Sequence, residues 1–362
     1  MKLFLLAGEA SGDLHGSHLV TELKLQRPDL EIVAWGGPLM EKAGARLLSD
    51  YRQRAYMGLW EVIKNLRSLR QFLRAAVQDI ERENPDAVVF IDNPGFNMRV
   101  LKRLQTFKGQ THFYIAPKAW AWNEKRAQDL KSLTALYGIL PFEAEWFGQR
   151  GVNCTYIGNP LMDQIPEQTS ASKPLLALLP GSRKQEVESL LPLMIEAATA
   201  MPELTPVIAG TSALPIELYR SILKDSTIEL QVDQTYNLLQ EAQLALVTSG
   251  TATLETALFG VPQVVLYRTS ALTYWAAKWM IKVPYISLVN LVAQSEIVPE
   301  LIQGHCHVTS IQSQLKRLAP EGLGWLKQKQ EYAVLRDRLG EPGVNKRLAD
   351  SILQALSLHH ER

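Results

Sequence analysis

Two stretches decide the fold of this chain: residues 177–188, ALLPGSRKQEVE, and residues 247–259, VTSGTATLETALF. Each is predicted to be a buried strand that ends in a turn of small residues and then opens a helix. Such a helix start leaves backbone N–H groups free and carries the positive end of the helix dipole, so it suits a phosphate. Either stretch alone is equally well explained as a tightly packed turn, because short motifs are weak signals. Two of them in one half of the chain favour a binding site.

The two turns together predict a site for a nucleotide diphosphate. Their small residues let an anion approach the backbone closely, and Arg183 adds a fixed positive charge with a planar set of donors. Glu255 follows one helical turn into the second helix, about 6 Å along its axis. A carboxylate there can accept hydrogen bonds from both ribose hydroxyls. The predicted nucleotide contacts are Gly181, Ser182, Arg183, Ser249, Gly250, Thr251 and Glu255.

Length and composition indicate an ordinary globular protein with two domains. The chain has 362 residues, of which 46% are hydrophobic and 21% are charged. A net charge of +1 gives no overall attraction to nucleic acid, so any anion site must be local. Cys154 and Cys306 are expected to be small hydrophobic residues in a reducing compartment. The sequence shows no metal-ligand spacing of Cys or His.

The apolar run at the N-terminus, MKLFLLA, breaks at Gly8-Glu9 and is too short for a signal peptide, so we expect it to be the first strand. Residues 242–267 form the longest weakly charged run. Residues 248–251, Glu255 and the turn at 260–262 interrupt it, which predicts a strand, a helix and a strand rather than a membrane span. We therefore expect a cytoplasmic protein that does not cross a bilayer.

Short apolar runs alternate with helical patterns along the chain, which predicts parallel sheets with helices on both faces. Residues 159–174, rich in Pro, Ser, Thr and Gln, are expected to form a linker. The predicted fold is α/β, with two Rossmann-like doubly wound domains that face a cleft. Their expected bounds are 1–165 and 166–340. A closing helix within 341–362 packs either back on the first domain or on the second.

The first predicted strand ends in GEASGD, residues 8–13, where a dinucleotide-binding domain would carry GxGxxG. Glu9 and Asp13 would repel a pyrophosphate at close range. The N-terminal half is therefore a poor nucleotide site and a better place for acid–base chemistry.

Taken together, these segments resemble the lipid-A-disaccharide synthases, a family of inverting glycosyltransferases with two Rossmann-like domains, the GT-B fold. The resemblance runs along nearly the whole chain, and GEASGD and the WAW segment are its most specific parts. The matching segments are AGEASGD (7–13), GGPLM (36–40), MGLWEV (57–62), IDNPGFN (91–97), APKAWAW (116–122), LPFE (140–143), GNPL (158–161), LPGSR with Glu186 (179–186), SGTATLE (249–255) and SLVNL (287–291).

The resemblance implies a donor like UDP-2,3-diacylglucosamine and an acceptor like 2,3-diacylglucosamine 1-phosphate. It implies inverting transfer to the acceptor 6-hydroxyl, which gives a β-1,6-linked disaccharide 1-phosphate and UDP in lipid A biosynthesis. UDP agrees with the site predicted in the C-terminal half. No cofactor or metal is expected, because helix starts and Arg183 can neutralise the leaving diphosphate and no Asp-x-Asp motif lies near that site.

The general base is expected in the N-terminal half, across the cleft from UDP. The candidates are Asp92, Glu9 and Asp13, each predicted near the carboxyl end of a strand. We favour Asp92, because the apolar strand AVVFID delivers its carboxylate at the edge of the sheet; a cap on the next turn is the alternative role. The chain departs from many family members at Gly95, where they carry a second Asp, and at Asn159, where they often carry a His.

Four other motif residues have two interpretations each. Asn97 and Asn290 suit contacts with sugar hydroxyls, or act as turn residues that bond nearby backbone. Trp120 and Trp122 either pack in the core or share a face with sugar or acyl chains.

Residues 59–74 predict a basic amphipathic helix, which lies in an anionic membrane interface or packs its apolar stripe on the sheet. Lipid substrates favour the first, with peripheral association at the inner face of the cytoplasmic membrane. Arg67 or Arg70 is an alternative contact for the acceptor phosphate. Segment 274–286, rich in aromatic and Lys residues, suits the bilayer, a homodimer contact or the core.

Two other classes of function stay open. One is another UDP-N-acetylglucosamine enzyme of this fold, a 2-epimerase or a murein-precursor transferase. The other is a non-catalytic lipid- or nucleotide-binding relative, for which Gly95 is the hint. Turnover of UDP-diacylglucosamine separates the enzyme from the binding protein, and dependence on acyl chains separates the synthase from an epimerase.

Overall fold

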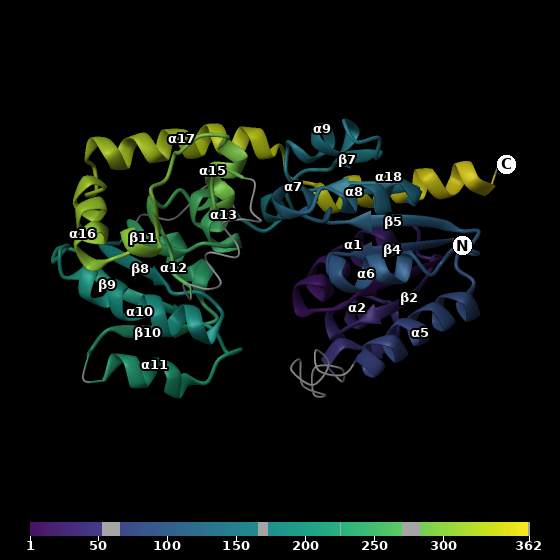
Figure 1. The fold of residues 1–362 in the computed structure, drawn as a ribbon, viewed down its shortest axis with the longest axis horizontal. Helices are drawn as coiled ribbons and strands as arrows, with labels where there is room; N and C mark the ends of the chain where they lie inside the picture. Colours follow the sequence, from purple (N-terminus) through teal and green to yellow (C-terminus); the bar gives the residue numbers. More distant parts are fainter. Residues whose placement is uncertain (53–65, 166–172, 225, 270–282, 361–362) are drawn as a thin grey trace. The chain divides into compact units, whose positions relative to one another are not determined.

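The computed structural model describes residues 1–52, 66–165, 173–224, 226–269 and 283–360 (Figure 1). The chain divides into two compact units. Unit 1 comprises Met1–Asp163 together with Glu341–Arg362, and unit 2 comprises Gln164–Gly340.

Unit 1 is built on a parallel sheet with the strand order β3-β2-β1-β4-β5-β6-β7 among the described residues. The central strands β1 and β4 pair from Leu3 with Ala87 to Ala7 with Ile91. Nearly all of their side chains are buried, because helices cover both faces, and this is why their sequences are uniformly apolar. The strands are β1 (Lys2–Ala7), β2 (Glu31–Gly36), β3 (Arg46–Asp50), β4 (Ala87–Ile91), β5 (Gln110–Tyr114), β6 (Ala135–Gly138) and β7 (Cys154–Tyr156).

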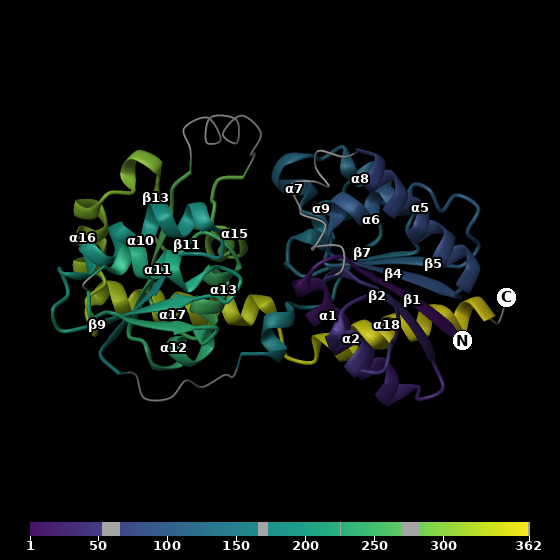
Figure 2. The ribbon, with the colours of Figure 1, turned by 90° about the horizontal axis from the view of Figure 1, so that it is seen from below.

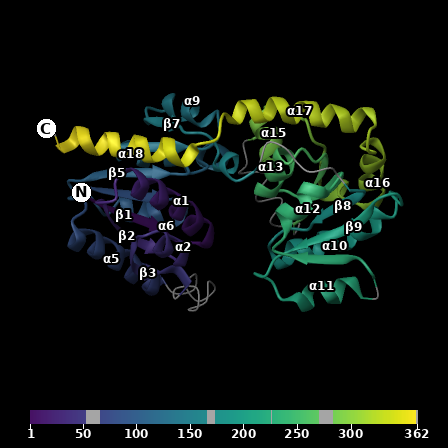
Figure 3. The same ribbon diagram turned by 180° about the vertical axis from the view of Figure 1, so that it is seen from behind.

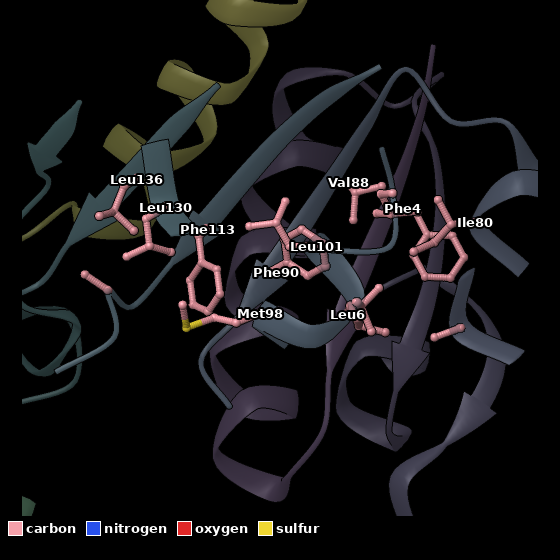
Figure 4. Packing of buried hydrophobic residues seen from close by; sticks show 14 of the residues in the cluster. Phe4, Leu6, Ile80, Val88, Phe90, Met98, Leu101, Phe113, Leu130 and Leu136 are labelled. Atoms are coloured by element: carbon pink, nitrogen blue, oxygen red, sulfur yellow. The ribbon is translucent and has the colours of Figure 1, made fainter. Parts of the chain in front are cut away.

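Helices pack on both faces of this sheet (Figure 2). Helices α5 and α6 cover one face, where Ile80 and Met98 join Phe4 and Phe90 in a continuous apolar core (Figure 4). Helix α1 packs on the other face and contacts α18. The helices of unit 1 are α1 (Ala10–Gln26), α2 (Pro38–Lys42), α5 (Leu66–Glu83), α6 (Pro94–Leu101), α7 (Ala119–Trp122), α8 (Arg126–Asp129), α9 (Glu143–Gly148) and α18 (Val344–His360), with 3₁₀ turns η1 (Leu130–Ser132) and η2 (Pro160–Asp163).

Unit 2 repeats the design with the strand order β10-β9-β8-β11-β12-β13, again parallel. Helices α10 and α16 share one apolar core with the sheet, and α17 packs against α13 and α15 (Figure 3). The strands are β8 (Leu175–Leu179), β9 (Thr205–Gly210), β10 (Glu229–Val232), β11 (Leu244–Thr248), β12 (Gln263–Tyr267) and β13 (Glu300–Ile302). The helices are α10 (Lys184–Ala198), α11 (Ile216–Leu223), α12 (Thr235–Glu241), α13 (Thr251–Leu258), α15 (Leu288–Ala293), α16 (Val308–Arg317) and α17 (Leu323–Leu339), with the 3₁₀ turn η3 (Gln303–His305).

In both sheets the chain starts at a central strand, adds strands out to one edge, and then returns to the centre to build the other half. This order is that of the doubly wound fold, so the predicted class of two Rossmann-like α/β units is confirmed. The sequence patterns do not predict the edge strands β3 and β13, because these runs are short and their side chains are partly exposed.

The C-terminal helix α18 lies in unit 1. Asp163, at the end of η2, caps its N-terminus: the carboxylate accepts the backbone N–H groups of residues 343–345 at 2.6 to 3.0 Å. Further along the helix, the amide of Gln110 in β5 donates to the Ala355 carbonyl at 2.7 Å. These contacts fasten α18 to the sheet of unit 1.

The helix predicted over residues 59–74 is described from Leu66 onward, as the start of α5, and the side chain of Arg67 lies outside the described part. In the described part its apolar stripe faces the core: Leu69 packs against the apolar cluster of unit 1, and Leu73 is 2% exposed. Arg70 is exposed. For residues 69–73 the membrane-facing interpretation is therefore wrong, because the sheet already covers the stripe.

Segment 274–286, the other candidate for membrane or dimer contact, is described only from residue 283 onward. Within the described ranges, no helix combines the length and the apolar character needed to cross a membrane.

Candidate functional site

The predicted site residues lie at the carboxyl ends of the central strands of each unit. In unit 1, Glu9 follows β1 and Asp92 follows β4, and these strands are neighbours from which the chain runs to opposite edges. In unit 2, the turn at 180–183 follows β8 and the turn at 249–251 follows β11, which are neighbours in the same sense. Ligands of doubly wound sheets bind at this point, where the strand order reverses.

The turn at 249–251 is open. Gly250 is the N-cap residue of α13, and among the described side chains none caps the helix start. Gly250 and Thr251 are exposed, and a Cβ placed on Gly250 would meet no described atom within 4 Å. Ser249 anchors the turn by donating its hydroxyl to the Ile286 carbonyl at 2.9 Å. The exposed helix start carries the positive end of the dipole and therefore suits a phosphate.

The turn at 180–183 is arranged differently, because a carboxylate of the chain itself fills it. Gly181 has φ +100°, a conformation that residues with a side chain avoid. The next two backbone N–H groups, of Ser182 and Arg183, both donate to Glu186 Oε2 at 3.2 Å. Arg183 Nη1 donates to Glu186 Oε1 at 2.9 Å, while 82% of the Arg183 side chain stays exposed. The group that this turn presents outward is thus the guanidinium.

Glu255, the predicted ribose carboxylate, lies one turn into α13 and has a partner that sequence analysis missed. The Tyr236 hydroxyl, from α12, donates to Glu255 Oε1 at 2.9 Å, and the Tyr236 ring packs edge-on against Phe259. Burial raises the pKa of the Glu255 carboxyl, and the bond from Tyr236 opposes that rise. The chain carries no motif around Tyr236 that would have revealed this contact.

Glu9 and Asp92 are the two carboxylates at the reversal point of unit 1. Burial raises the pKa of the Asp92 carboxyl, although a hydrogen bond from the Asn93 backbone and the charge of Lys118 act the other way. Burial also raises the pKa of the Glu9 carboxyl, and the negative charge of Asp92 adds to the rise. Each carboxylate is therefore a stronger base than in water, which is what proton abstraction near neutral pH requires.

The backbone holds Asp92 in a rare conformation. Asp92 has φ +47° and Asn93 has φ +43°, both in the left-handed region. The Asp92 N–H donates to the Tyr114 carbonyl at 2.9 Å, and its own carbonyl accepts Asn97 Nδ2 at 2.7 Å. Such conformations persist where the surroundings enforce them, and they cluster at functional sites. The backbone at Asp92, from which its carboxylate extends, is thus held in place before any substrate arrives.

Asp13, the third candidate base, is engaged in the fold. It is 1% exposed, and its two carboxylate oxygens accept the backbone N–H groups of Leu39 and Met40, each at 3.1 Å. Leu39 and Met40 lie in the first turn of α2, so Asp13 caps the N-terminus of that helix. Because both of its carboxylate oxygens are occupied, Asp13 is less available as a base than Glu9 or Asp92.

Asn97 and Asn290 are both fully buried. The Asn97 amide donates to three backbone carbonyls at the ends of β1 and β4. The Asn290 amide donates to the Val298 carbonyl and the Glu300 carboxylate, and its oxygen accepts two backbone N–H groups. Both side chains bond nearby backbone, as expected for turn residues, and their burial leaves them away from any sugar.

Gly95 and the tryptophans complete the predicted positions. A Cβ on Gly95 would meet Asn93 Oδ1 at 4.0 Å, so this position has room for a side chain. Trp120 is 6% exposed and donates its indole N–H to Glu143 at 3.0 Å, which favours core packing. The side chain of Trp122 lies outside the described part. In the described part of the chain, no three His, Cys, Asp or Glu side chains are grouped to hold a metal ion.

Comparisons with known proteins give a consistent answer. A family model described as lipid-A-disaccharide synthetase matches residues 3–354. The lipid-A-disaccharide synthase of Myxococcus xanthus is 35% identical, covering 98% of this chain and 97% of the relative. That of Gluconobacter oxydans is 36% identical, covering 94% of this chain and 86% of the relative.

Among solved structures, the UDP-GlcNAc 2-epimerase from Neisseria meningitidis bound to UDP-GlcNAc aligns with a TM-score of 0.65 over 98% of this chain and 100% of that chain. At 12% identity this likeness shows a shared two-unit fold. The sequence matches are far closer and span nearly the whole chain, and on them the chain belongs to the lipid-A-disaccharide synthetase family.

Proposed function

We propose that this protein is a lipid-A-disaccharide synthase, a UDP-sugar-dependent glycosyltransferase. It transfers 2,3-diacylglucosamine from UDP to the 6-hydroxyl of 2,3-diacylglucosamine 1-phosphate. The observation that carries the proposal is the chemistry at the two reversal points. Unit 2 combines the uncapped start of α13 with the outward guanidinium of Arg183 and the Glu255 carboxylate one helical turn further on. Unit 1 holds Glu9 and Asp92, two carboxyl groups with raised pKa.

UDP binds to unit 2 in this proposal. Its diphosphate lies at the start of α13 within reach of Arg183, and its ribose hydroxyls donate to Glu255. The uncapped N-terminus of α13 and the Arg183 guanidinium stabilise the charge that develops on the diphosphate as the bond to the sugar breaks. Such preorganised donors are commonly the largest single contribution to catalysis.

The chemical step is one direct displacement with inversion. Asp92 takes the proton of the acceptor 6-hydroxyl, and that oxygen forms a bond to the anomeric carbon of the donor. The bond from that carbon to the diphosphate breaks at the same time, and its electron pair leaves with UDP. The raised pKa of the Asp92 carboxyl brings it closer to the working pH, which improves a general base. Glu9 is the second candidate for this role.

Because both substrates carry acyl chains, we place the reaction at a membrane surface to which the protein binds peripherally. The described apolar stripe of α5 does not make this contact, since Leu69 and Leu73 pack in the core. The exposed Arg70 and Arg74 of α5 are available to anionic headgroups or to the acceptor phosphate.

The test is release of UDP from UDP-2,3-diacylglucosamine in detergent, with and without diacylglucosamine 1-phosphate. We expect release that requires the acceptor and yields a disaccharide phosphate. Asp92→Asn should lower turnover by about 10²- to 10⁴-fold while UDP binding stays unchanged. Glu9→Gln is the matched variant at the neighbouring carboxylate. UDP binding without acceptor-dependent release would refute the synthase and favour a binding protein, and turnover of a donor without acyl chains would favour an epimerase.

A further inference from the structure

The turn at 180–183 already binds an anion, and that anion is the side chain of Glu186. Two consecutive backbone N–H groups, of Ser182 and Arg183, converge on one carboxylate oxygen. Convergent N–H groups of this kind form the anion-binding concavities found in phosphate sites. A donor phosphate therefore cannot use these two N–H groups unless Glu186 leaves.

Glu186 is well held where it lies. It is the third residue of α10 and reaches back to the N–H of the N-cap residue Arg183, an arrangement that satisfies helix starts in many proteins. Its side chain is 19% exposed and accepts three hydrogen bonds, one of them from a guanidinium. Displacement by a phosphate would break all three.

Arg183, unlike Glu186, is largely exposed and has donors to spare. Its bond to Glu186 uses Nη1, one of three guanidinium nitrogens, and 82% of the side chain is exposed. A guanidinium is a rigid planar fork, so a hydrogen bond at one of its nitrogens restricts the directions of the other donors. The carboxylate thus orients the cation as well as bonding it.

We propose that Glu186 is a positioning residue of the donor site: it fastens the turn and orients Arg183 so that the guanidinium, and not the backbone of this turn, binds the donor diphosphate. The proposal rests on the proposed function, because it takes unit 2 to bind UDP. It assigns the backbone contacts with phosphate to the open start of α13 alone.

The experiment compares Glu186→Gln with Glu188→Gln. Glu188 lies two residues further along α10 and pairs with Lys184 at 3.7 Å on the surface, so its substitution removes the same charge without touching the turn. Dissociation constants for UDP and for uridine are measured by calorimetry. We expect Glu186→Gln to weaken UDP binding about tenfold and to leave uridine binding unchanged, because the lost contact is to phosphate. Glu188→Gln should change neither constant.

A double-mutant cycle with Arg183→Ala separates positioning from a purely structural role. If Glu186 acts through Arg183, Glu186→Gln should not weaken UDP binding further once Arg183 is gone. Equal weakening in both backgrounds would overturn the proposal, and so would tighter UDP binding by Glu186→Gln, which would mean that the carboxylate competes with the phosphate.

Arg183→Lys provides a test that leaves Glu186 unchanged and stands if Glu186→Gln does not fold. A single ammonium cannot reproduce the fork that bonds Glu186 and a phosphate together, so UDP binding should weaken about fivefold or more. Wild-type affinity in this variant would contradict the proposal. Failure of the wild-type protein itself to bind UDP would instead refute the proposed function.

Discussion

The hydrogen bond from Tyr236 to Glu255 should set the pH at which the protein loses its affinity for UDP. Burial raises the pKa of the Glu255 carboxyl, and the bond from Tyr236 lowers it by stabilising the charged form. In the proposed function the ionised carboxylate is the form that accepts both ribose hydroxyls. UDP affinity is therefore full above this pKa and falls as the pH drops through it. Tyr236→Phe raises the pKa, so the fall should begin at a higher pH.

The size of the effect follows from the geometry. The bond is 2.9 Å long and partly buried, and hydrogen bonds to charged groups contribute about 1.5–3 kcal/mol. Loss of this bond disfavours the ionised carboxylate by an energy of that order, so at mildly acidic pH UDP should bind about tenfold more weakly to Tyr236→Phe than to the wild type. The ring contact with Phe259 is retained in Tyr236→Phe, so the helices keep their packing.

The assay is calorimetric titration of UDP from mildly acidic to mildly alkaline pH. The terminal phosphate of UDP titrates equally against both proteins and cancels in the comparison. Tyr219→Phe is the control, because Tyr219 is another tyrosine of unit 2, fully buried, and its hydroxyl accepts the Thr211 N–H at 3.2 Å, away from Glu255. A midpoint in Tyr236→Phe that equals those of the wild type and the control would refute the role of Tyr236.

Three further predictions test other parts of the structure. Glu255→Ala should weaken binding of UDP about tenfold but hardly change binding of 2′,3′-dideoxy-UDP, measured by calorimetry, and equal losses for both would remove Glu255 from the ribose site. Gly95→Asp should fold, because the nearest described atom to its Cβ is 4.0 Å away, and should leave turnover unchanged if Asp92 is the base. A rise of tenfold or so in its turnover would assign the base to position 95 instead. Asp163→Ala should speed hydrogen exchange of the α18 amides by a factor equivalent to about 2 kcal/mol. Asp350→Ala removes a surface pair with Lys346 and a side-chain contact with Gln26 but no helix cap, and should have a much smaller effect.

The strands that build both sheets could be predicted from the sequence because they are buried on both faces. AVVFI of β4 and LALVT of β11 are apolar runs bounded by turn residues, which is the pattern that predicts a buried strand. The edge strands β3 and β13 were missed; their runs are short and partly exposed. Exposure alone does not explain this, since the edge strands β7 and β10 are at least as exposed and fall in runs that the sequence predicts as strands.

The candidate site was predictable only in part, for a different reason. Local spacing indicates which residues follow a strand, and it placed Glu9, Asp92 and both turns of unit 2 at the reversal points. It does not indicate what a side chain contacts across the fold. Asp13 looks as catalytic as Asp92 in the sequence, yet its partners, the N–H groups of Leu39 and Met40, lie 26 and 27 residues away.

The two units share one strand order, so the difference in their chemistry must come from the residues at the reversal points. After β11 the turn SGT leaves the start of α13 uncapped. After β8 the Glu186 carboxylate occupies the turn, and the group turned outward is the Arg183 guanidinium, so both turns present positive character. After β1 and β4 the chain instead supplies Glu9 and Asp92, whose mutual repulsion and burial would disfavour an anion and favour a proton. A diphosphate leaving group needs the first environment and a general base needs the second. Reversal of charge at either point should therefore abolish turnover. Arg183→Glu should do so through loss of UDP binding, and Asp92→Arg through loss of proton transfer.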